Sequence, residues 1–491
     1  MARKKTKPGP GATCLGVVKH PAIGIRIPEL FLPGILAGYK KRDCAGELML
    51  SFGRETAPEK IIRAKPGVWE ITRGHTGTSI KQYQSQGAKA AEKAGVTVEI
   101  EADHLIIIGS ATAAVQRIAG YHAESHISEE ELQASLDYNM MAVDEAAKVG
   151  VVGCFTTDTS DLFWLEADGL SCKKARALFE ERFKPEERRK ILARYRKPRE
   201  FKGADGKKVR VSISKNRVMR LALKFQRSLE INAQVYRYCK RALGRREFSF
   251  EISLDETADM TDPRETLFYL TEWKALGLPC QYFAPHIGFG KRADFRGDMG
   301  ELQKRVRQHH AITWGVSRAL LSIHSGSGTT PKSGKGKGTY EAILAGTGGN
   351  VKYKISGVYF ELLMEMLAAQ PACSDARSLY NRIFDECLRL LKREIRTSGA
   401  LAQPLLIAQM KKYEAAIKRN PKKKRDPRAD FFRFNSYLAL NMRDDDGKRY
   451  HREALLALLK GDAELRAAFD AEVEALTLRL IDGLEFANNL G

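Results

Sequence analysis

Four short apolar runs of this chain each end in residues that can do acid–base or metal chemistry. The runs are VTVEIEADH, FSFEISLDET, PCQYFAPHIGF and ALLSIHSGSG, and each has the length and composition of a β-strand. The reactive residues at their ends are Asp103, His104, Asp255, Glu256, His286 and His324. Imidazoles bind transition metals, and carboxylates act as general acids and bases. The pattern therefore predicts a divalent-metal site with an acid/base pair beside it.

A closed barrel of parallel strands would position these residues together, because the C-terminal ends of its strands meet at one mouth. Strand patterns such as NVKYKISG alternate with helical patterns such as 79–95 and 127–150, which is typical of a parallel sheet. We therefore expect an α/β fold, a TIM-like (β/α)8 barrel. Strand alternation lets only one of Asp103 and His104 point straight into such a barrel, although the loop beyond can turn the other inward.

The chain also divides into segments of different character. Residues 1–45 have the pattern of an N-terminal tail and lead-in, and residues 46–371 that of the barrel. Residues 169–247 are charged and mostly helical in pattern, which predicts a helical insertion. Residues 372–491 are helical to the end, which predicts a C-terminal helical extension. The whole length of 491 residues fits one barrel of about 250 residues with large additions.

The composition excludes several classes of protein. No apolar stretch approaches the roughly 20 residues that span a bilayer, and the basic N-terminus lacks the apolar core of a signal peptide. None of the eight cysteines form a CxxC pair, which argues against a structural zinc finger and a dense disulfide framework. We therefore expect a cytoplasmic protein with reduced thiols.

The formal net charge of +22 raises the question of a nucleic-acid partner. Much of the excess lies in residues 186–227 and 415–430, neither of which carries a recognisable nucleic-acid motif. Aromatic residues make up only 8% of the chain, so a base-stacking platform is not indicated. We interpret the basic segments as a solvated surface, expect nucleic acid not to be the partner, and leave a homo-oligomer open.

Further polar residues near the strand ends are candidates for binding a substrate. They are Lys291, Arg292, Asp294, Ser325 and Lys354. The cations could meet an anion, while Ser325 begins a Gly-rich turn that lets the backbone approach a ligand. The loop at 325–339 resembles a phosphate loop, but Lys335 and Lys337 are each followed by Gly, so it fails the Walker pattern.

The segments FSFEISLDET, FAPHIGFGKRADFRGD, LLSIHSGSG and NVKYKISG resemble, in order, the tagaturonate/fructuronate epimerase family, which includes epimerases of tagatose and fructose. The resemblance covers roughly 245–370, with EADH at 101–104 the main contribution of the N-terminal half. It implies a metal-dependent barrel enzyme of hexuronate catabolism and a distant likeness to class II aldolases. That likeness implies that Asp103 is a base and that His104 is a metal ligand.

The predicted site thus has one divalent metal (Zn, Mn, Ni, Fe or Co) held by His104, His286 and His324. Should His286 contact substrate instead, Asp255 or Glu256 would replace it. The acid/base pair is expected to be Asp103 and Glu256, with Asp255 as the substitute for Glu256. The predicted reaction inverts C4 of a ketohexuronate by retro-aldol and aldol steps. The alternatives are a class II-type aldolase or isomerase acting on a sugar phosphate, and a nucleic-acid-binding protein.

Overall fold

Eight parallel strands close into a barrel in the computed structural model, which describes residues 8–65, 74–109, 127–324 and 328–491. The barrel strands are β2 (His20–Gly24), β3 (Gly46–Ser51), β6 (Thr97–Ile106), β7 (Cys154–Asp158), β10 (Ser249–Leu254), β11 (Tyr282–Pro285), β12 (Leu320–His324) and β13 (Val351–Ile355). Each strand pairs with the next along the chain, and β13 pairs with β2 to complete the ring. The predicted TIM-like barrel is confirmed.

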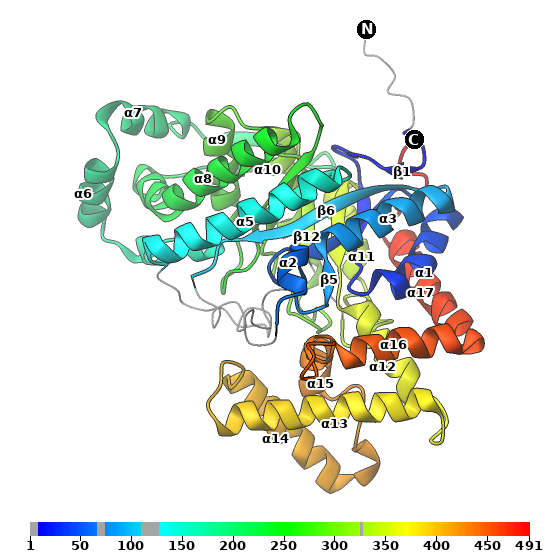
Figure 1. Ribbon diagram of the computed structural model, residues 1–491. Helices are drawn as coiled ribbons and strands as arrows, with labels where there is room; N and C mark the ends of the chain where they lie inside the picture. The colour runs from blue at the N-terminus through cyan, green and yellow to red at the C-terminus, as the bar shows by residue number, and fades with distance from the viewer. Residues whose placement is uncertain (1–7, 66–73, 110–126, 325–327) are drawn as a thin grey trace.

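Helices connect consecutive strands, one more helix follows the last strand, and together they cover the outside of the barrel (Figure 1). They are α1 (Pro28–Lys41), α3 (Ile80–Ala94), α5 (Glu129–Val149), α8 (Lys215–Leu243), α9 (Pro263–Ala275), α10 (Met299–Ser317), α11 (Thr339–Thr347) and α12 (Val358–Ala368). Local signals fix the helix ends: Ser128 and Glu131 form a capping box at the start of α5, and Gly150 ends that helix in the left-handed conformation.

The barrel begins earlier than the sequence patterns predict. Residues 1–45, expected to be a tail and lead-in, contribute β2 and α1 to the barrel, and β1 (Gly11–Ala12) pairs with the start of β6. The five residues of β2 are HPAIG, whose proline and glycine are unusual in a strand interior and hide the pattern. The segment VWEITRGHTG at 68–77, whose pattern also suggests a strand, falls mostly on 66–73, outside the described residues.

The insertion between β7 and β10 is helical, as expected, but it also contains a hairpin. Its elements are η1 (Ser160–Leu162), η2 (Leu165–Gly169), α6 (Cys172–Arg182), α7 (Pro185–Arg194) and the antiparallel strands β8 (Arg199–Lys202) and β9 (Lys208–Val211). Gly206 takes the positive φ of 80° that the turn between these two strands requires. The long helix α8 is the barrel crossover itself, packed against α5 and α9.

The C-terminal extension forms a helical layer beside the C-terminal end of the barrel, seen at the bottom of Figure 1. It comprises α13 (Asp375–Arg396), α14 (Pro404–Arg419), η3 (Pro421–Lys423), α15 (Asp430–Asn435), η4 (Ser436–Asn441), α16 (Tyr450–Gly461) and α17 (Ala463–Gly483). It meets the segment after β3, which holds β4 (Thr56–Ala57), α2 (Glu59–Ile62) and β5 (Thr78–Ser79). The last helix, α17, returns along α1, where Gly34 and Gly38 allow close approach.

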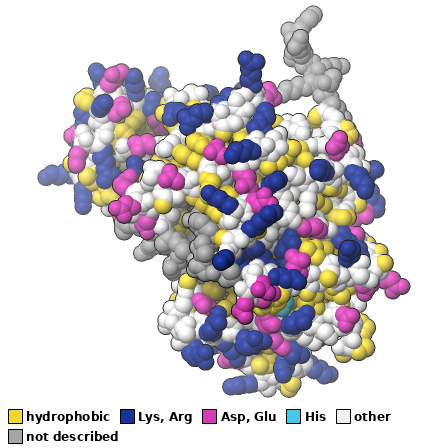
Figure 2. All heavy atoms as spheres, in the orientation of Figure 1, with side chains coloured by type: hydrophobic (Ala, Val, Ile, Leu, Met, Phe, Trp, Pro, Cys, Tyr) yellow, Lys and Arg dark blue, Asp and Glu magenta, His cyan; other side chains and the backbone are white. Residues whose placement is uncertain are grey.

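The surface in Figure 2 carries lysine and arginine side chains spread over the whole face, with acidic side chains among them. This distribution agrees with a solvated basic surface rather than one continuous binding stripe. Among the described helices, none combines the length and the apolar character needed to cross a membrane.

Candidate metal centre

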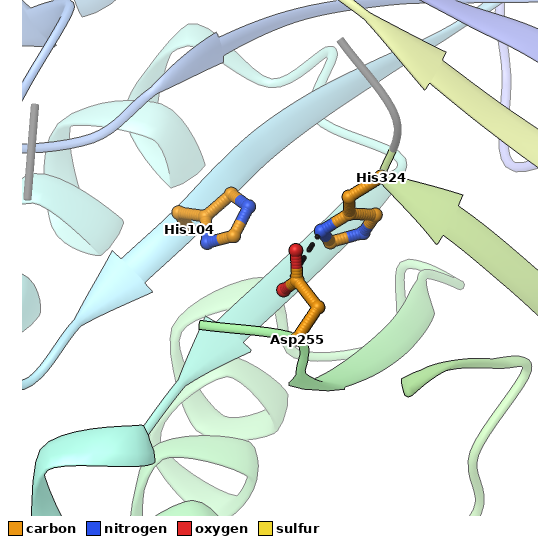
Figure 3. A group of neighbouring side chains, drawn as sticks. All are labelled: His104, Asp255 and His324. Carbon is orange, nitrogen blue, oxygen red and sulfur yellow. Dashed lines mark hydrogen bonds and ion pairs between the residues drawn. The ribbon is translucent and has the colours of Figure 1, made fainter. Parts of the chain in front are cut away.

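Three side chains from different strands meet at the C-terminal end of the barrel, as Figure 3 shows. His104 comes from β6, Asp255 directly follows β10, and His324 is the last residue of β12. One potential ligand atom from each lies within 4.8 Å of the other two. The Nδ1 atom of His324 is 3.1 Å from Oδ1 of Asp255, and the two imidazole rings are 5.0 Å apart between centroids. Strands distant in sequence therefore deliver a histidine–carboxylate group to one point.

A bulge in β6 explains how Asp103 and His104 both face the interior. The register between β6 and β7 shifts between Ala102 and Leu105, so β6 holds one extra residue there. His104 takes a positive φ of 48° at the bulge, a backbone conformation that costs about 1–3 kcal/mol for a residue other than glycine. Asp103 and His104 are both only 6% exposed. Consecutive residues thus reach the same site, which regular alternation forbids.

Each ring nitrogen of His324 contacts a carboxylate. Its Nε2 lies 2.5 Å from Oε1 of Glu251, and its Nδ1 contacts Asp255. Burial alone would lower the pKa of His324, but Asp255 and Glu251 raise it to about 10. The surrounding carboxylates therefore stabilise positive charge at this position.

Below the metal centre, buried lysines neutralise the acidic interior of the barrel. Lys354 donates to Glu101 Oε1 at 2.7 Å and to Asp103 Oδ1 at 2.8 Å. Lys352, fully buried, lies 2.9 Å from Oε2 of Glu251. Although burial alone would raise the pKa of Glu251, the two lysines hold it well below its usual range. The lysine at 354, expected to meet substrate, instead holds Asp103 in place from within the barrel.

Glu256, adjacent to Asp255, faces the other side of the centre. Its Oε1 accepts from Nη1 of Arg54 at 2.9 Å. Glu256 also has a carboxylate oxygen within 4.8 Å of ligand atoms of both His104 and Asp158. Two adjacent carboxylates therefore contact different parts of one site, because they lie in the loop after β10 rather than in the regular strand.

His286, predicted as the third imidazole ligand, is not brought to this group. It follows β11, but its Nδ1 lies 3.0 Å from the carbonyl oxygen of Asp259, and its backbone N–H donates to Thr261. Among the described residues, Asp255 takes the third place beside His104 and His324. Asp255 is one of the two carboxylates that the sequence offers in place of His286.

The candidate substrate residues occupy different environments. Lys291 is exposed, and Asp294 accepts from the backbone N–H of Thr329, tying the loop after β11 to the loop after β12. Arg292 is half-buried and pairs with Glu361 at 3.0 Å. Ser325 lies outside the described residues.

Sequence patterns missed three members of the site, namely Asp158, Arg54 and the inward role of Glu251. Asp158 is the last residue of β7 and is fully buried, with Oδ2 3.8 Å from Nδ1 of His104. Its signal was present, since it ends a short apolar run as Asp103 does. Arg54 follows β3 and carries no such signal, because single arginines in loops are common.

The residues present suit a divalent cation. Carboxylates outnumber cationic side chains around the centre, and the buried Nδ1 of His104 has no hydrogen-bond partner within the described parts of the chain. Imidazole nitrogens and carboxylate oxygens are ligands for zinc and for other transition metals. The group of His104, Asp255 and His324 could therefore hold a metal ion.

Fold and site together define a (β/α)8-barrel protein with a histidine–carboxylate centre at the C-terminal ends of its strands. The chain belongs to the tagaturonate epimerase family (UxaE), whose family profile matches residues 129–416, more than half of its length. The matched range contains Asp255, Glu256 and His324, while Asp103 and His104 precede it.

A curated protein and two solved structures are also similar to this chain. A tagaturonate/fructuronate epimerase of Thermotoga maritima is 28% identical over 128 residues, which are 26% of this chain and 25% of that relative. The native crystal structure of the fructuronate-tagaturonate epimerase UxaE from Cohnella laeviribosi superposes with a TM-score of 0.64 at 17% identity. That superposition covers 97% of this chain and 83% of the other, and a complex of the same enzyme with one glycerol superposes equally well.

Proposed function

We propose that this protein is a metal-dependent carbohydrate epimerase that interconverts D-tagaturonate and D-fructuronate, or related ketohexoses, at C4. The observation that carries the proposal is the meeting of His104, Asp255 and His324 at the barrel mouth of a chain in the tagaturonate epimerase family. The names of the relatives from Thermotoga maritima and Cohnella laeviribosi support the choice of substrate.

Inversion at C4 is chemically best served by breaking and remaking a carbon–carbon bond. The hydrogen on C4 is β to the C2 ketone, so its removal yields no stabilised anion. Cleavage of the C3–C4 bond instead gives an enediolate and an aldehyde. Rotation of the aldehyde before the bond forms again delivers the opposite configuration at C4.

A divalent metal held by His104, Asp255 and His324 would supply positive charge that stabilises the negative charge developing on the C2 and C3 oxygens. Glu251 accepts from His324, fixing the orientation of that imidazole. His104 and Glu251 are buried, and Asp255 and His324 are partly buried, which limits the access of bulk water and strengthens the electrostatic interactions within the site.

We assign the acid/base pair to Asp103 and Glu256, which come from the ends of two different strands. One carboxylate takes the proton from the C4 hydroxyl as the C3–C4 bond breaks. The other, in its protonated form, donates a proton to the C4 oxygen from the opposite side as the bond forms again. Lys354 orients Asp103, and Arg54 orients Glu256. Two carboxylates on different strands suit this reaction, because the bond to C4 forms on opposite faces of the aldehyde in the two epimers.

The direct test is to incubate the metal-loaded protein with D-tagaturonate and with D-fructuronate and to follow both by NMR. We expect each sugar acid to convert into the other and to reach the same equilibrium mixture. Release of two smaller fragments at the rate of turnover would support an aldolase instead. No conversion of either compound with any of the five expected metals would refute the epimerase.

A further inference from the structure

Three arginines lie beside the metal centre at the same end of the barrel. Arg26 follows β2, Arg54 follows β3 and Arg292 follows β11, so all three are in loops at the C-terminal ends of strands. Their side chains are largely buried, with exposed fractions of 12%, 14% and 15%. Since Arg54 contacts Glu256, this arginine cluster adjoins the candidate metal centre.

Two of these guanidinium groups converge on one point next to Gly357. A methyl group at the Cβ position of Gly357 would lie 3.3 Å from Nη2 of Arg292 and 3.7 Å from both Nη atoms of Arg26. These nitrogens are the nearest atoms there, apart from the chain neighbours of the glycine. A small group at this point would thus face donors from two different loops.

Two further polar side chains border the arginine cluster, and their polar atoms make no hydrogen bond within the parts of the chain that the structure describes. Tyr437 of η4 and His75 are each 2% exposed, and their rings are 4.7 Å apart between centroids. Within the described residues, neither the Tyr437 hydroxyl nor either ring nitrogen of His75 makes a hydrogen bond. The guanidinium of Arg26 lies 5.6 Å from the centre of the Tyr437 ring. Buried polar atoms of this kind normally have a partner, which indicates a ligand.

The cluster contains more guanidinium groups than carboxylates directly paired with them. Arg433 of α15 joins it, because its Nη2 lies 2.9 Å from Oε2 of Glu361, the carboxylate that also pairs with Arg292. The guanidiniums are those of Arg26, Arg54, Arg292 and Arg433, and the carboxylates paired with them are those of Glu55, Glu256 and Glu361. Four guanidiniums thus share three directly paired carboxylates, while Asp103 and Asp158 also lie near Arg54. The Arg26 and Arg292 side of the cluster is therefore the side that favours an anion.

We propose that this arginine cluster binds the C6 carboxylate of the hexuronate, through Arg26 and Arg292, and that the Tyr437 hydroxyl donates a hydrogen bond to the same group. The assignment rests on the proposed function and identifies what distinguishes a hexuronate from a neutral ketohexose at this site. Arginine suits the role, because its planar fork matches the two oxygens of a carboxylate.

The position of the cluster orients the sugar. The carboxylate is two carbons from C4, and Arg54, a member of the cluster, donates to Glu256, the proposed acid/base residue. A sugar anchored by C6 at Arg26 and Arg292 therefore extends its C2 and C3 oxygens toward His104, Asp255 and His324. Tyr437 belongs to the C-terminal extension, which gives that extension a part in substrate binding.

The test compares D-tagaturonate with D-tagatose, which carries a CH2OH group in place of the carboxylate. We expect Arg26→Gln to raise KM for D-tagaturonate about ten- to a hundredfold, because it removes a charge-assisted hydrogen bond. The ratio of kcat/KM for D-tagaturonate to kcat/KM for D-tagatose should fall by the same factor. Tyr437→Phe should raise KM about three- to tenfold. Because this hydroxyl has no partner within the described residues, its removal does not endanger folding.

Arg42→Gln is the matched control, since Arg42 pairs with Asp482 at 2.6 Å far from the barrel mouth. This variant should leave unchanged the ratio of kcat/KM for D-tagaturonate to kcat/KM for D-tagatose. Active Arg26→Gln and Tyr437→Phe proteins with an unaltered ratio would overturn the carboxylate assignment, as would faster turnover of D-tagatose 6-phosphate than of the hexuronate. An inactive wild-type protein would instead count against the proposed function itself.

Discussion

Asp255 and His324 lie 69 positions apart in sequence, yet Oδ1 of the first is 3.1 Å from Nδ1 of the second. They follow β10 and end β12, the two strands that flank β11. The contact therefore passes over the end of β11, and the histidine that follows β11, His286, is turned toward the carbonyl oxygen of Asp259. This relationship separates His324 from His286, the predicted ligand for which the sequence left a replacement open.

Metal content should depend on the three converging residues and not on His286. We expect His104→Ala, Asp255→Ala and His324→Ala each to lower the bound metal, measured by elemental analysis after dialysis, at least tenfold, because each removes a ligand. The matched control His286→Ala should keep its metal. Full metal in the His324→Ala protein would show that the centre is elsewhere.

Variants of the two carboxylates assigned to proton transfer should lose turnover without losing the metal. Asp103→Asn and Glu256→Gln preserve shape but remove the base, so kcat should fall about 10²–10⁴-fold while the variants still fold and keep their metal. Steady-state kinetics on D-tagaturonate measures the loss. Near-normal turnover in both variants would remove these residues from the mechanism.

Solvent isotope incorporation distinguishes carbon–carbon cleavage from proton exchange at C4. In the retro-aldol route the hydrogen on C4 stays on its carbon, so product formed in D2O should carry no deuterium there. NMR before equilibrium provides the measurement. Substantial deuterium at C4 would exclude the aldol route, although the protein could still be an epimerase. Trapping of the aldehyde fragment would directly support cleavage of the C3–C4 bond.

Lys352, one of the two buried lysines in the barrel, should be essential for stability. Lys352 is fully buried and ion-paired with Glu47, Glu101 and Glu251. Lys352→Met leaves buried negative charge without its cation, so the free energy of unfolding should fall by about 3–5 kcal/mol. The control Lys41→Met breaks an exposed pair with Glu474 and should cost less than about 1 kcal/mol. Denaturant titration measures both, and equal effects would contradict this account.

Much of the architecture could be predicted from the sequence, because local patterns encode it. The alternation of strand and helix signals predicts the barrel, and the residues ending the strands at His104 and His324 are correctly placed at its mouth. The first strand could not be found, since HPAIG carries proline and glycine and becomes a strand only by pairing with β13 and β3. Pairing between distant segments overrides weak local preference.

Tertiary structure alone decided which of the reactive side chains meet. The sequence supplied Asp103 and His104 as neighbours, but only the bulge against β7 lets both face inward. It supplied three candidate histidine ligands with His286 the one open to replacement, but only the loop after β11 turns His286 away. It gave no sign that Tyr437, more than 300 residues from Arg26, would pack against that arginine. Such contacts depend on how the C-terminal helices dock on the barrel, which no local pattern records.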